Sequence, residues 1–206
     1  MQIVDLSVAY EQGGSVVPVV SGLSFDAEPG RVTALVGPSG AGKSSVLRVL
    51  AGIQQADSAM LEVDGPVALV YQDSRLVNFL TVSENLALAA DLTGAAGDEV
   101  SGSAILARLG LAGLEDRMPL SLSGGERHRV ALARAVVMKA RTLLVDEPTA
   151  ALDRASATGV AELLRMLARS LTITMVVATH DPLIFEGADH VVNLGRVARG
   201  PKLHAE

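Results

Sequence analysis

The sequence predicts an α/β fold with a mostly parallel sheet flanked by helices. We expect an antiparallel β region at the N-terminus and a helical region inserted into the middle of the chain. The prediction rests on the order of the segments. From residue 122 onward, apolar strand-like runs alternate with amphipathic helical runs, whereas residues 73–121 have helical character and residues 1–30 contain short β-like stretches.

The N-terminal third reads as strands around one glycine-rich loop. "IVDLSVAY", "SVVPVV" and "GLSFDA" are predicted as short strands separated by Gly and Pro breaks. "RVTALVG" is an apolar strand that ends in the glycine-rich loop, and "SSVLRVLAG" continues as a helix that stops at Gly52. "AMLEVDGPVALVYQ" predicts a pair of strands around the turn signal Asp64-Gly65.

The middle of the chain predicts helices. Thr81 stands three residues before Glu84, which is a capping-box pattern that opens a helix, and "SAILARLGLAGLEDRM" continues helically. We therefore expect residues 1–206 to form one domain, in which residues 73–121 are a helical subdomain. Residues 1–72 and 122–206 would form the core together with the antiparallel β lobe.

The C-terminal part alternates strands and helices. "TLLVDEP" is a predicted strand, and "RASATGVAELLRMLARS" is a helix with Val160, Leu163, Leu164 and Leu167 on one apolar stripe. "LTITMVVATHD" is nearly all apolar, as buried parallel strands are, and "HVVNLG" is a final strand.

Composition excludes several classes of protein. The 206 residues include no cysteine, so neither disulfides nor a thiolate metal site can form. No apolar run approaches the ~20 residues that span a bilayer, and the first residues lack the basic and apolar regions of a signal peptide. A net charge of −6 argues against a nucleic-acid partner, because a phosphate backbone favours a basic surface.

The loop "GPSGAGKSS" matches the pattern G-x-x-x-x-G-K-S/T at Gly37, Gly42, Lys43 and Ser44, between a strand and a helix. Glycines let backbone N–H groups surround phosphates. Lys43 would place positive charge at the β and γ phosphates, and the Ser44 hydroxyl can ligate Mg²⁺. The loop predicts a nucleoside triphosphate site.

Two adjacent carboxylates, Asp146 and Glu147, follow three apolar residues in "LLVDEP". The carboxyl ends of parallel strands line the ligand crevice of such a sheet. Pro148 favours the end of the strand at this point. Asp146 would then serve Mg²⁺ through water, and Glu147 would polarise an attacking water at the γ-phosphate.

The stretch "SLSGGERHRVALARA", residues 121–135, is a second helix start with small residues. A helix N-terminus with exposed N–H groups attracts anions, yet this one lacks a lysine. A purely structural interpretation is a capped amphipathic helix with Val130, Ala133, Val136 and Val137 toward the core. This interpretation is compatible with an anion-binding helix start.

With this stretch the sequence resembles the ATP-binding cassette (ABC) ATPases. "LSGGE" at 122–126 resembles the signature loop of that family. Gln72 resembles the Q-loop residue, Asp153 the end of the D-loop, His180 the switch histidine and Tyr10 the aromatic A-loop residue. The motifs follow the order of the family along essentially the whole chain. The style of the cassette is most similar to the lipoprotein-release and macrolide-export branch.

The resemblance implies a P-loop NTPase core, ATP and Mg²⁺ as ligands, and hydrolysis of ATP. It implies the catalytic residues Glu147, His180, Lys43 and Gln72, and the metal-binding residues Ser44, Gln72 and Asp146. The ATP-binding residues in the same chain are Tyr10, Gly37, Pro38, Ser39, Gly40, Ala41, Gly42, Lys43, Ser44, Ser45, Gln72 and Asp146. A second copy would contribute Ser123, Gly124, Gly125, Glu126 and Asp153 to the same nucleotide, which explains why the second helix start needs no lysine.

The family also implies a separate membrane permease, which the cassette would join at the cytoplasmic face of the cell membrane. We expect the contact at residues 73–86, where Leu76, Val77, Phe79 and Leu80 serve either docking or the core. The branch favours export or extraction of a hydrophobic or amphiphilic substrate such as haem, lipid, peptide or drug. The alternative is a non-transport ABC ATPase acting on a soluble macromolecular complex. A P-loop kinase or GTPase would leave the signature loop unexplained.

Further expectations concern the exposure of histidines and arginines, Tyr10 and the antiparallel lobe. His128, His190 and His204 are predicted at the surface, and Arg127, Arg129 and Arg134 as a solvated face or an interface. Tyr10 either stacks on adenine or packs a strand end. Almost nothing intervenes between "LEVDG" and "VALVYQ", where the family carries about twenty more residues, so a trimmed antiparallel lobe is expected.

Overall fold

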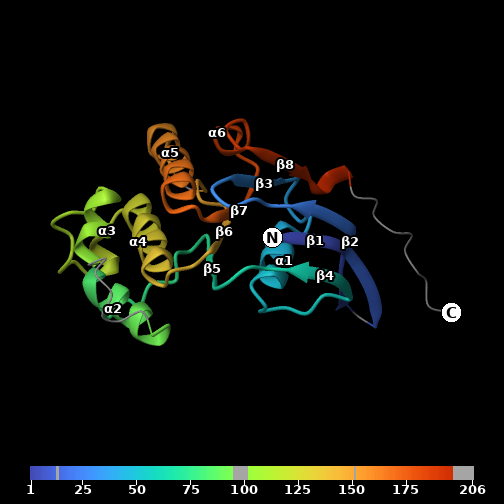
Figure 1. Ribbon diagram of the computed structural model, residues 1–206, viewed down its shortest axis with the longest axis horizontal. Coiled ribbons are helices and arrows are strands. Elements are labelled where there is room, and N and C mark those ends of the chain that lie inside the picture. Colours follow the sequence, from blue (N-terminus) through green and yellow to red (C-terminus); the bar gives the residue numbers. More distant parts are fainter. Residues whose placement is uncertain (13, 95–101, 151, 197–206) are drawn as a thin grey trace.

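Two sheets and the helices around them make up the computed structural model, which describes residues 1–12, 14–94, 102–150 and 152–196 (Figure 1). The strands are β1 (Gln2–Gln12), β2 (Ser15–Asp26), β3 (Val32–Val36), β4 (Ser58–Glu62), β5 (Val67–Val70), β6 (Thr142–Asp146), β7 (Thr174–Thr179) and β8 (His190–Asn193). The α-helices are α1 (Lys43–Leu50), α2 (Val82–Leu92), α3 (Gly102–Arg108), α4 (Gly124–Val137), α5 (Arg154–Leu171) and α6 (Pro182–Phe185), and the 3₁₀ turns are η1 (Pro119–Ser121) and η2 (Leu194–Arg196). None of the helices in these ranges combines the length and the apolar character that crossing a bilayer requires.

The antiparallel sheet has the strand order β2-β1-β4. The expected breaks within residues 1–30 are absent, because β2 runs without interruption through Pro18 and Gly22. Pro18 is tolerated because β2 lies at the edge of the sheet, and Gly22 takes a φ of 63° where the pairing with β1 shifts register. Three short strands were therefore the wrong prediction, and two long strands with bulges replace them.

The predicted pair of strands around Asp64-Gly65 is also corrected. Both strands exist, but β4 pairs with β1 in the antiparallel sheet and β5 pairs with β6 in the parallel sheet. Gly65, at a φ of 72°, makes the turn between the two sheets, and the side chain of Arg141 packs where a β-carbon would stand. The local turn signal was right, but the partners of the strands are set by distant residues.

The parallel sheet has the order β5-β6-β7-β3-β8, and its neighbouring strands pair in parallel. β7 is buried at every position, which explains its continuous apolar sequence. The predicted alternation of strands and helices is thereby confirmed, as is the α/β fold class. All the carboxyl ends of these strands meet at one edge, which is where ligands bind in open α/β sheets.

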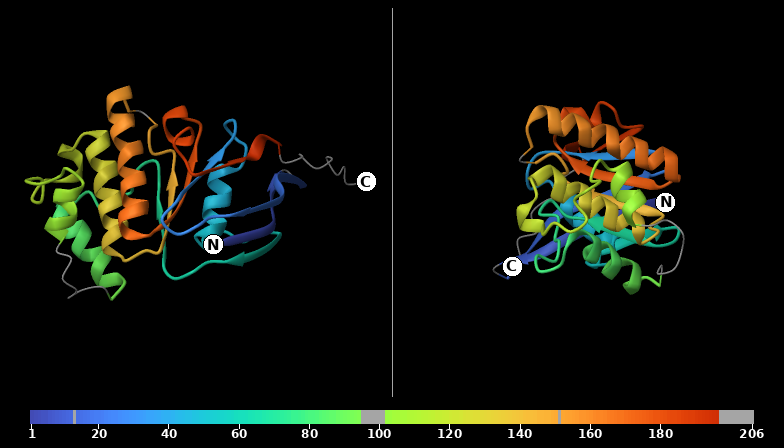
Figure 2. Two further views of the ribbon diagram at one scale, coloured as in Figure 1. Left: turned by 45° about the horizontal axis from the view of Figure 1, so that its top comes forward. Right: turned by 90° about the vertical axis from the view of Figure 1, so that its left-hand side faces the viewer.

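Helices cover both faces of the parallel sheet. Leu143 and Val145 of β6 join the core cluster that contains α4 and α5, whereas Leu144 between them joins the cluster that contains α1 and the antiparallel strands. Alternate strand residues point to opposite faces, so α1 and α4 lie on opposite sides of the sheet. Figure 2 shows α4 and α5 (yellow and orange) on one side of the strands and α1 (cyan) on the other.

Between β5 and α4, the chain forms α2, α3 and η1, which lie beside α4 (Figure 1). The capping box of Thr81 and Glu84 is confirmed at the start of α2. The helix expected through Met118 ends instead at Arg108, and Gly110 follows with a φ of 68°. A left-handed glycine just past a helix is a stop signal, and here it overrides the apolar pattern that continues beyond it.

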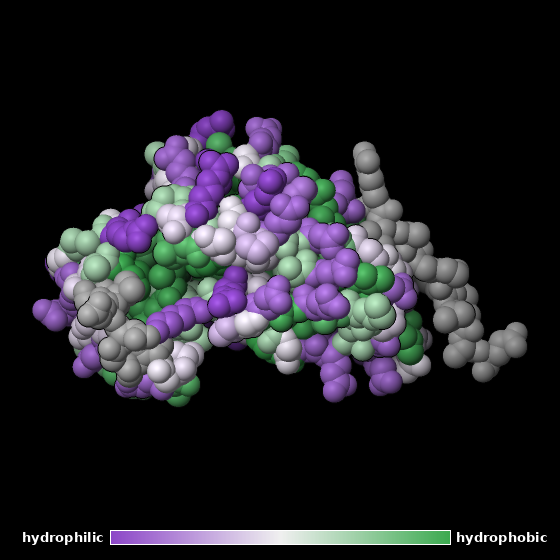
Figure 3. Space-filling model, viewed as in Figure 1, coloured by the Kyte–Doolittle hydropathy of each residue, from purple (hydrophilic) through white to green (hydrophobic). Residues whose placement is uncertain are grey.

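An apolar cleft of about 990 Å³ lies between α2, α3, the end of α4 and the start of β7. Leu86, Ile105, Val136 and Ile173 are among its lining residues. Figure 3 shows apolar side chains gathered on this helical end of the molecule. The cleft adjoins the amino ends of β6 and β7, so it is separate from the edge where the carboxyl ends meet.

Candidate nucleotide-binding site

Four strands of the parallel sheet end in residues that the sequence marks as functional. β3 ends before Gly37, β5 before Gln72 and β7 before His180, while Asp146 is the last residue of β6. β5 and β6 are neighbours, and so are β6 and β7 and then β7 and β3. The parallel sheet therefore brings these four positions to one edge, although they are far apart in the sequence.

The glycine-rich loop joins β3 to α1 and needs glycine for steric reasons. Gly42 is the N-cap of α1 at a φ of 91°. A β-carbon there would lie 2.6 Å from Val20 and 2.7 Å from Val19 on β2. The start of α1 has no side-chain cap and no acidic residue in its first turn. Its first N–H groups are thus open to an anionic ligand such as a phosphate.

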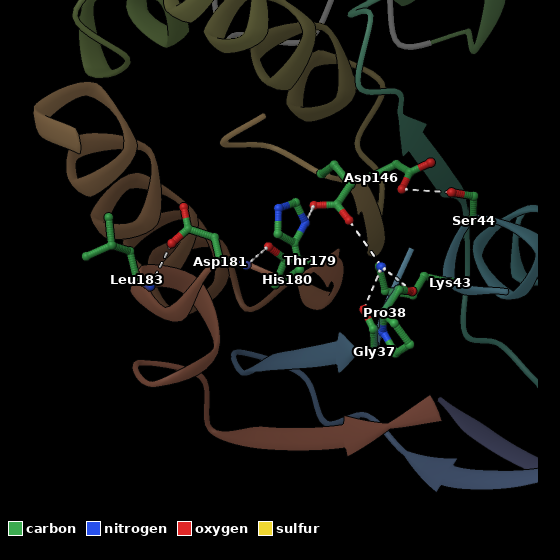
Figure 4. Close-up of polar contacts among 10 residues, drawn as sticks. Gly37, Pro38, Lys43, Ser44, Asp146, Thr179, His180, Asp181 and Leu183 are labelled. Atoms are coloured by element: carbon green, nitrogen blue, oxygen red, sulfur yellow. Dashed lines mark hydrogen bonds and ion pairs between the residues drawn. The ribbon is translucent and has the colours of Figure 1, made fainter. Parts of the chain in front are cut away.

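Lys43 is held at the mouth of this loop. Its side chain is 8% exposed, and its ammonium group donates to the carbonyl oxygens of Gly37 at 2.9 Å and Pro38 at 3.3 Å. The same group forms an ion pair of 3.3 Å with Glu147. Figure 4 shows the ammonium group facing the carbonyls of the loop. A cation so placed can bind the phosphates that the loop surrounds.

Ser44 and Asp146 provide oxygen donors beside Lys43. The Ser44 hydroxyl donates to the Asp146 carboxylate at 3.1 Å (Figure 4). Burial raises the pKa of Asp146, and the hydrogen bond from Ser44 works in the opposite direction. No cluster of three or more His, Asp or Glu side chains suited to a metal occurs in the described ranges. These donors fit Mg²⁺, which binds to few protein oxygens and takes its other ligands from water and substrate phosphates.

Glu147 connects Lys43 to His180. One carboxylate oxygen pairs with Lys43, and the other lies 2.9 Å from Nδ1 of His180. Glu147 itself has a φ of 44°, and its backbone N–H donates to the carbonyl of Ala178 on β7. This conformation ends β6 at Asp146. A non-glycine residue in the left-handed region is strained, and such strain gathers at functional sites.

Tyr10 of β1 reaches the same region from the antiparallel sheet. Its hydroxyl lies 2.8 Å from the Ser45 hydroxyl of α1 and donates to Gln54 at 2.9 Å. The residue is 40% exposed, so part of its aromatic ring is open to solvent beside the start of α1. This position is compatible with a base stacked on the ring.

The second helix start differs from the first. Ser123 and Glu126 form a capping box, in which the Ser123 hydroxyl accepts from the Glu126 N–H and the Glu126 carboxylate accepts from the Ser123 N–H. These hydrogen bonds lower the pKa of Glu126. The Ser123 hydroxyl keeps its own proton to donate. Ser123 and Gly124 are exposed, while Gly125 is buried against Leu152 and Arg129.

The structure brings only part of the expected site together. Two small contact networks lie side by side: one joins Lys43, Glu147 and His180, and the other joins Ser44 and Asp146. The signature residues stand at the start of α4, on the face of the sheet opposite α1. Asp153 caps α5 with its carboxylate, which accepts from the N–H groups of Ala155 and Ser156. The expected partner residues are thus outside both networks.

One expectation about the polar residues of α4 is wrong. His128 is buried at 4% exposure, and burial lowers its pKa to about 4. Arg127, Arg129 and Arg134 are half-buried, which argues against a fully solvated face, and the alternative of an interface stays a prediction. α4 packs against the sheet on one side and against α2 and α3 on the other, so fewer of its faces meet water than an isolated amphipathic helix would suggest. His190 is exposed as expected, and His204 lies outside the described residues.

An apolar groove of about 400 Å³ lies beside the site, between the end of α1, β5, α2 and α4. Its lining includes Tyr71, Val77, Asn85, Leu92 and Arg134. The sequence did not single out Asn85, although it follows the capping-box residue Glu84 directly. Asn85 is 1% exposed, and it is bonded through both ends of its amide to the 77–81 loop. That loop carries Phe79, which is 80% exposed.

Comparison with known proteins identifies the family. The sequence profile of the ABC transporter family matches residues 20–150. The thiamine import ATP-binding protein ThiQ of Chelativorans sp. (strain BNC1) is 40% identical, over 73% of this chain and 67% of that protein. The lipoprotein-releasing system ATP-binding protein LolD 1 of Rhodopirellula baltica is 35% identical, over 85% of each chain.

The fold has a close match among solved structures. The dimeric bacterial ABC transporter cassette MJ0796 superposes with a TM-score of 0.84 at 23% identity, covering 100% of this chain and 99% of that one. A structural similarity at this sequence identity shows that the fold is shared, and the match to the family profile shows that the chain belongs to the family. The chain belongs to the ABC transporter family, as one of its ATP-binding ATPase cassettes.

Proposed function

We propose that this chain binds and hydrolyses ATP between two copies of itself and so drives a separate membrane permease. One observation carries the proposal. The chain has two helix starts suited to phosphate, at Lys43 and at Ser123, and they lie on opposite faces of its parallel sheet. One nucleotide in one chain cannot use both, whereas two copies related by a two-fold axis can each complete the other's site.

The geometry of the chain's own loop supports the proposed binding set. The loop from Gly37 to Gly42, together with Lys43, Ser44 and Ser45, would surround the phosphates, and the Tyr10 ring would stack on the adenine. Ser44, Gln72 and Asp146 would hold Mg²⁺, Asp146 through water. Mg²⁺, when bound, supplies neutralisation of phosphate charge. From the partner copy, the Ser123 hydroxyl and the Gly124 and Gly125 N–H groups would face the γ-phosphate, with Glu126 and Asp153 beside them.

Phosphoryl transfer to water needs positioning and charge neutralisation more than covalent chemistry. Glu147 would accept a proton from the attacking water, whose oxygen forms a bond to the γ-phosphorus. The bond from that phosphorus to the β-phosphate oxygen breaks, which gives ADP and inorganic phosphate. His180, 2.9 Å from Glu147, would orient the water and donate a hydrogen bond to the γ-phosphate. When the nucleotide binds, Lys43 would leave its ion pair with Glu147 and bind the phosphates instead.

Mixing two inactive variants tests whether the site is shared. Lys43→Ala removes the lysine of the loop, and Ser123→Arg blocks the signature loop. Each variant alone has two damaged sites in its dimer. An equal mixture contains mixed dimers with one intact site, so activity should return to about a quarter of the wild-type rate if the sites act independently. A mixture that stays inactive, or a monomer that hydrolyses ATP at full rate, would contradict the proposal.

The groove beside Gln72 is the proposed dock for a short segment of the permease. It is apolar, and Phe79 stands exposed on the loop next to it. Phe79→Ala should leave the ATPase rate of the isolated cassette unchanged and abolish co-purification with the permease. A permease that still co-purifies with Phe79→Ala would move the dock elsewhere. Docking would hold the cassette at the cytoplasmic face of the cell membrane.

For the direction of transport we propose export or extraction of a hydrophobic or amphiphilic substrate. The support is the match to the lipoprotein-releasing protein along 85% of both chains. Import proteins match as well, the thiamine import protein over 73% of this chain and a molybdenum import protein over 98% of it, although over smaller shares of their own length. ATPase stimulation of the reconstituted complex by haem, lipopeptides or drugs, and none by thiamine, would agree with this direction. Stimulation by thiamine alone would reverse it, and co-purification with a soluble complex in place of a permease would favour a non-transport ATPase.

A further inference from the structure

The turn just after Gln72 has an unusual backbone. Ser74 and Arg75 have φ values of 61° and 44°, so two consecutive non-glycine residues occupy the left-handed region. Each such residue costs about 1–2 kcal/mol. Ser74 is also buried, at 5% exposure. A strained turn without glycine, with Ser74 buried and Arg75 exposed, needs contacts from elsewhere to hold it.

Arg134 of α4 supplies those contacts. Its guanidinium donates from Nη1 to the carbonyl of Arg75 at 2.8 Å and from Nη2 to the carbonyl of Ser74 at 3.4 Å. Within the turn, the Ser74 N–H donates to the carbonyl of Tyr71, and the Arg75 guanidinium lies 3.6 Å above the Tyr71 ring. Arg134 therefore binds both strained residues at once, from a helix that follows in the sequence some sixty residues later.

The environment of Arg134 indicates that its guanidinium depends on these two carbonyl acceptors. Its side chain is half-buried, and burial lowers its pKa. A charged group withdrawn from water needs good acceptors, and the two carbonyls provide them. The planar fork of a guanidinium reaches both, which a lysine ammonium could not do equally well.

We propose that Arg134 is a positioning residue for Gln72, acting through the Ser74–Arg75 turn. The turn begins two residues after Gln72, and β5, which precedes Gln72, pairs with β6, which carries Asp146. The path of the turn thus sets where Gln72 stands at the edge shared with Asp146. The inference rests on the proposed role of Gln72 at Mg²⁺, and it makes α4, the helix that starts with the signature loop, the support of that residue.

Hydrogen exchange of the nucleotide-free protein tests the structural part. In Arg134→Met, the Ser74 and Arg75 amides should exchange at least about tenfold faster than in the wild type, because the turn loses its support. The Val77 amide is an internal control, since it donates to Asn85 and not to anything that Arg134 holds. Unchanged exchange at Ser74 and Arg75 would overturn the inference.

Binding of a non-hydrolysable ATP analogue at varied Mg²⁺ tests the link to Gln72. Arg134→Met should raise the half-saturating Mg²⁺ concentration about tenfold, the lower end of what supporting residues cost a metal site. Affinity for the analogue without Mg²⁺ should stay the same. Arg134→Lys should give a smaller shift, and it serves in place of Arg134→Met if that variant does not fold. Arg108→Met, another helical arginine, should cause none.

A double-mutant cycle separates the two possible failures. If Arg134 acts through Gln72, then adding Arg134→Met to Gln72→Ala should shift the Mg²⁺ requirement no further. A further shift in the double variant, or no shift from Arg134→Met alone, would overturn the inference. If Gln72→Ala by itself leaves the Mg²⁺ requirement unchanged, the proposed role of Gln72 fails and the inference falls with it.

Discussion

The carboxylate of Glu147 and the ammonium group of Lys43 form an ion pair of 3.3 Å at the carboxyl edge of the parallel sheet. Both side chains are largely buried, so the pair is screened less than a surface pair would be. Glu147 and the phosphates of a nucleotide would compete for the same lysine. ATP binding would release Glu147 for the attacking water.

Glu147→Gln should therefore separate binding from turnover. The neutral amide cannot accept the proton from water, so the rate of phosphate release should fall by about 10²–10⁴-fold. ATP binding should be retained, and dimers formed with ATP should persist in light-scattering measurements. Glu162→Gln, which changes an exposed glutamate of α5, should hydrolyse ATP normally. Turnover by Glu147→Gln at the wild-type rate would remove Glu147 from the catalytic residues.

Gly42→Ala should abolish nucleotide binding. A β-carbon at Gly42 would meet Val19 and Val20, and the backbone there has a φ of 91°. We expect the free energy of unfolding to fall by about 1–3 kcal/mol, measured by chemical denaturation. Gly52→Ala is the matched control, since Gly52 has a φ of 69° and open space around it. Gly52→Ala should be less stable than the wild type but should still bind nucleotide. Equal nucleotide affinity of Gly42→Ala and Gly52→Ala would contradict the steric argument.

Asn85→Ala should destabilise the loop that precedes α2. The Asn85 side chain accepts from the Val77 N–H and donates to the carbonyls of Val77, Leu80 and Thr81. Removing it takes away the side-chain partner of the Val77 N–H and of the Leu80 carbonyl, at a cost of about 2–3 kcal/mol in the free energy of unfolding. Asn78→Ala, at an exposed position of the same loop, should cost little. Equal denaturation midpoints for the two variants would show that the Asn85 contacts contribute nothing.

His128 should make stability depend on pH. Its pKa is lowered from 6.5 to about 4 in the folded chain, because burial disfavours the charged form. The unfolded chain binds a proton near pH 6.5 and the folded chain does not, so this stabilisation is complete above pH 6.5 and is lost as the pH falls toward 4. Between pH 7 and 5 the loss should be about 2 kcal/mol in the free energy of unfolding.

His128→Gln should remove that part of the pH dependence, because the amide does not titrate. Denaturation of both proteins at pH 7 and pH 5 measures the difference. His190→Gln is the control, since His190 is exposed on β8 and should leave the pH dependence as it is. A slope that His128→Gln does not change would mean that the imidazole is not held neutral in the folded protein.

Local chemistry in the sequence was sufficient for much of this structure. The strand before Gly37, the helix after it, the capping box at Thr81 and the end of β6 at Asp146 follow from turn residues and apolar periodicity within a few positions. The alternation of strands and helices predicts a parallel sheet. This predicts both the fold class and the edge of the sheet at which the ligand-binding residues gather. These features depend on neighbours in the chain, which a sequence displays directly.

Only the tertiary structure decided which surfaces are covered and which distant groups meet. β4 and β5 belong to different sheets, and His128 is buried. Arg134 donates a hydrogen bond to the turn that follows Gln72. The polar character of His128 suggested solvent, because a helix viewed alone shows one apolar stripe. The burial of a second side of α4 and the pairing of the strands arise from packing between segments that are far apart in the chain. A local pattern of residues does not predict such packing.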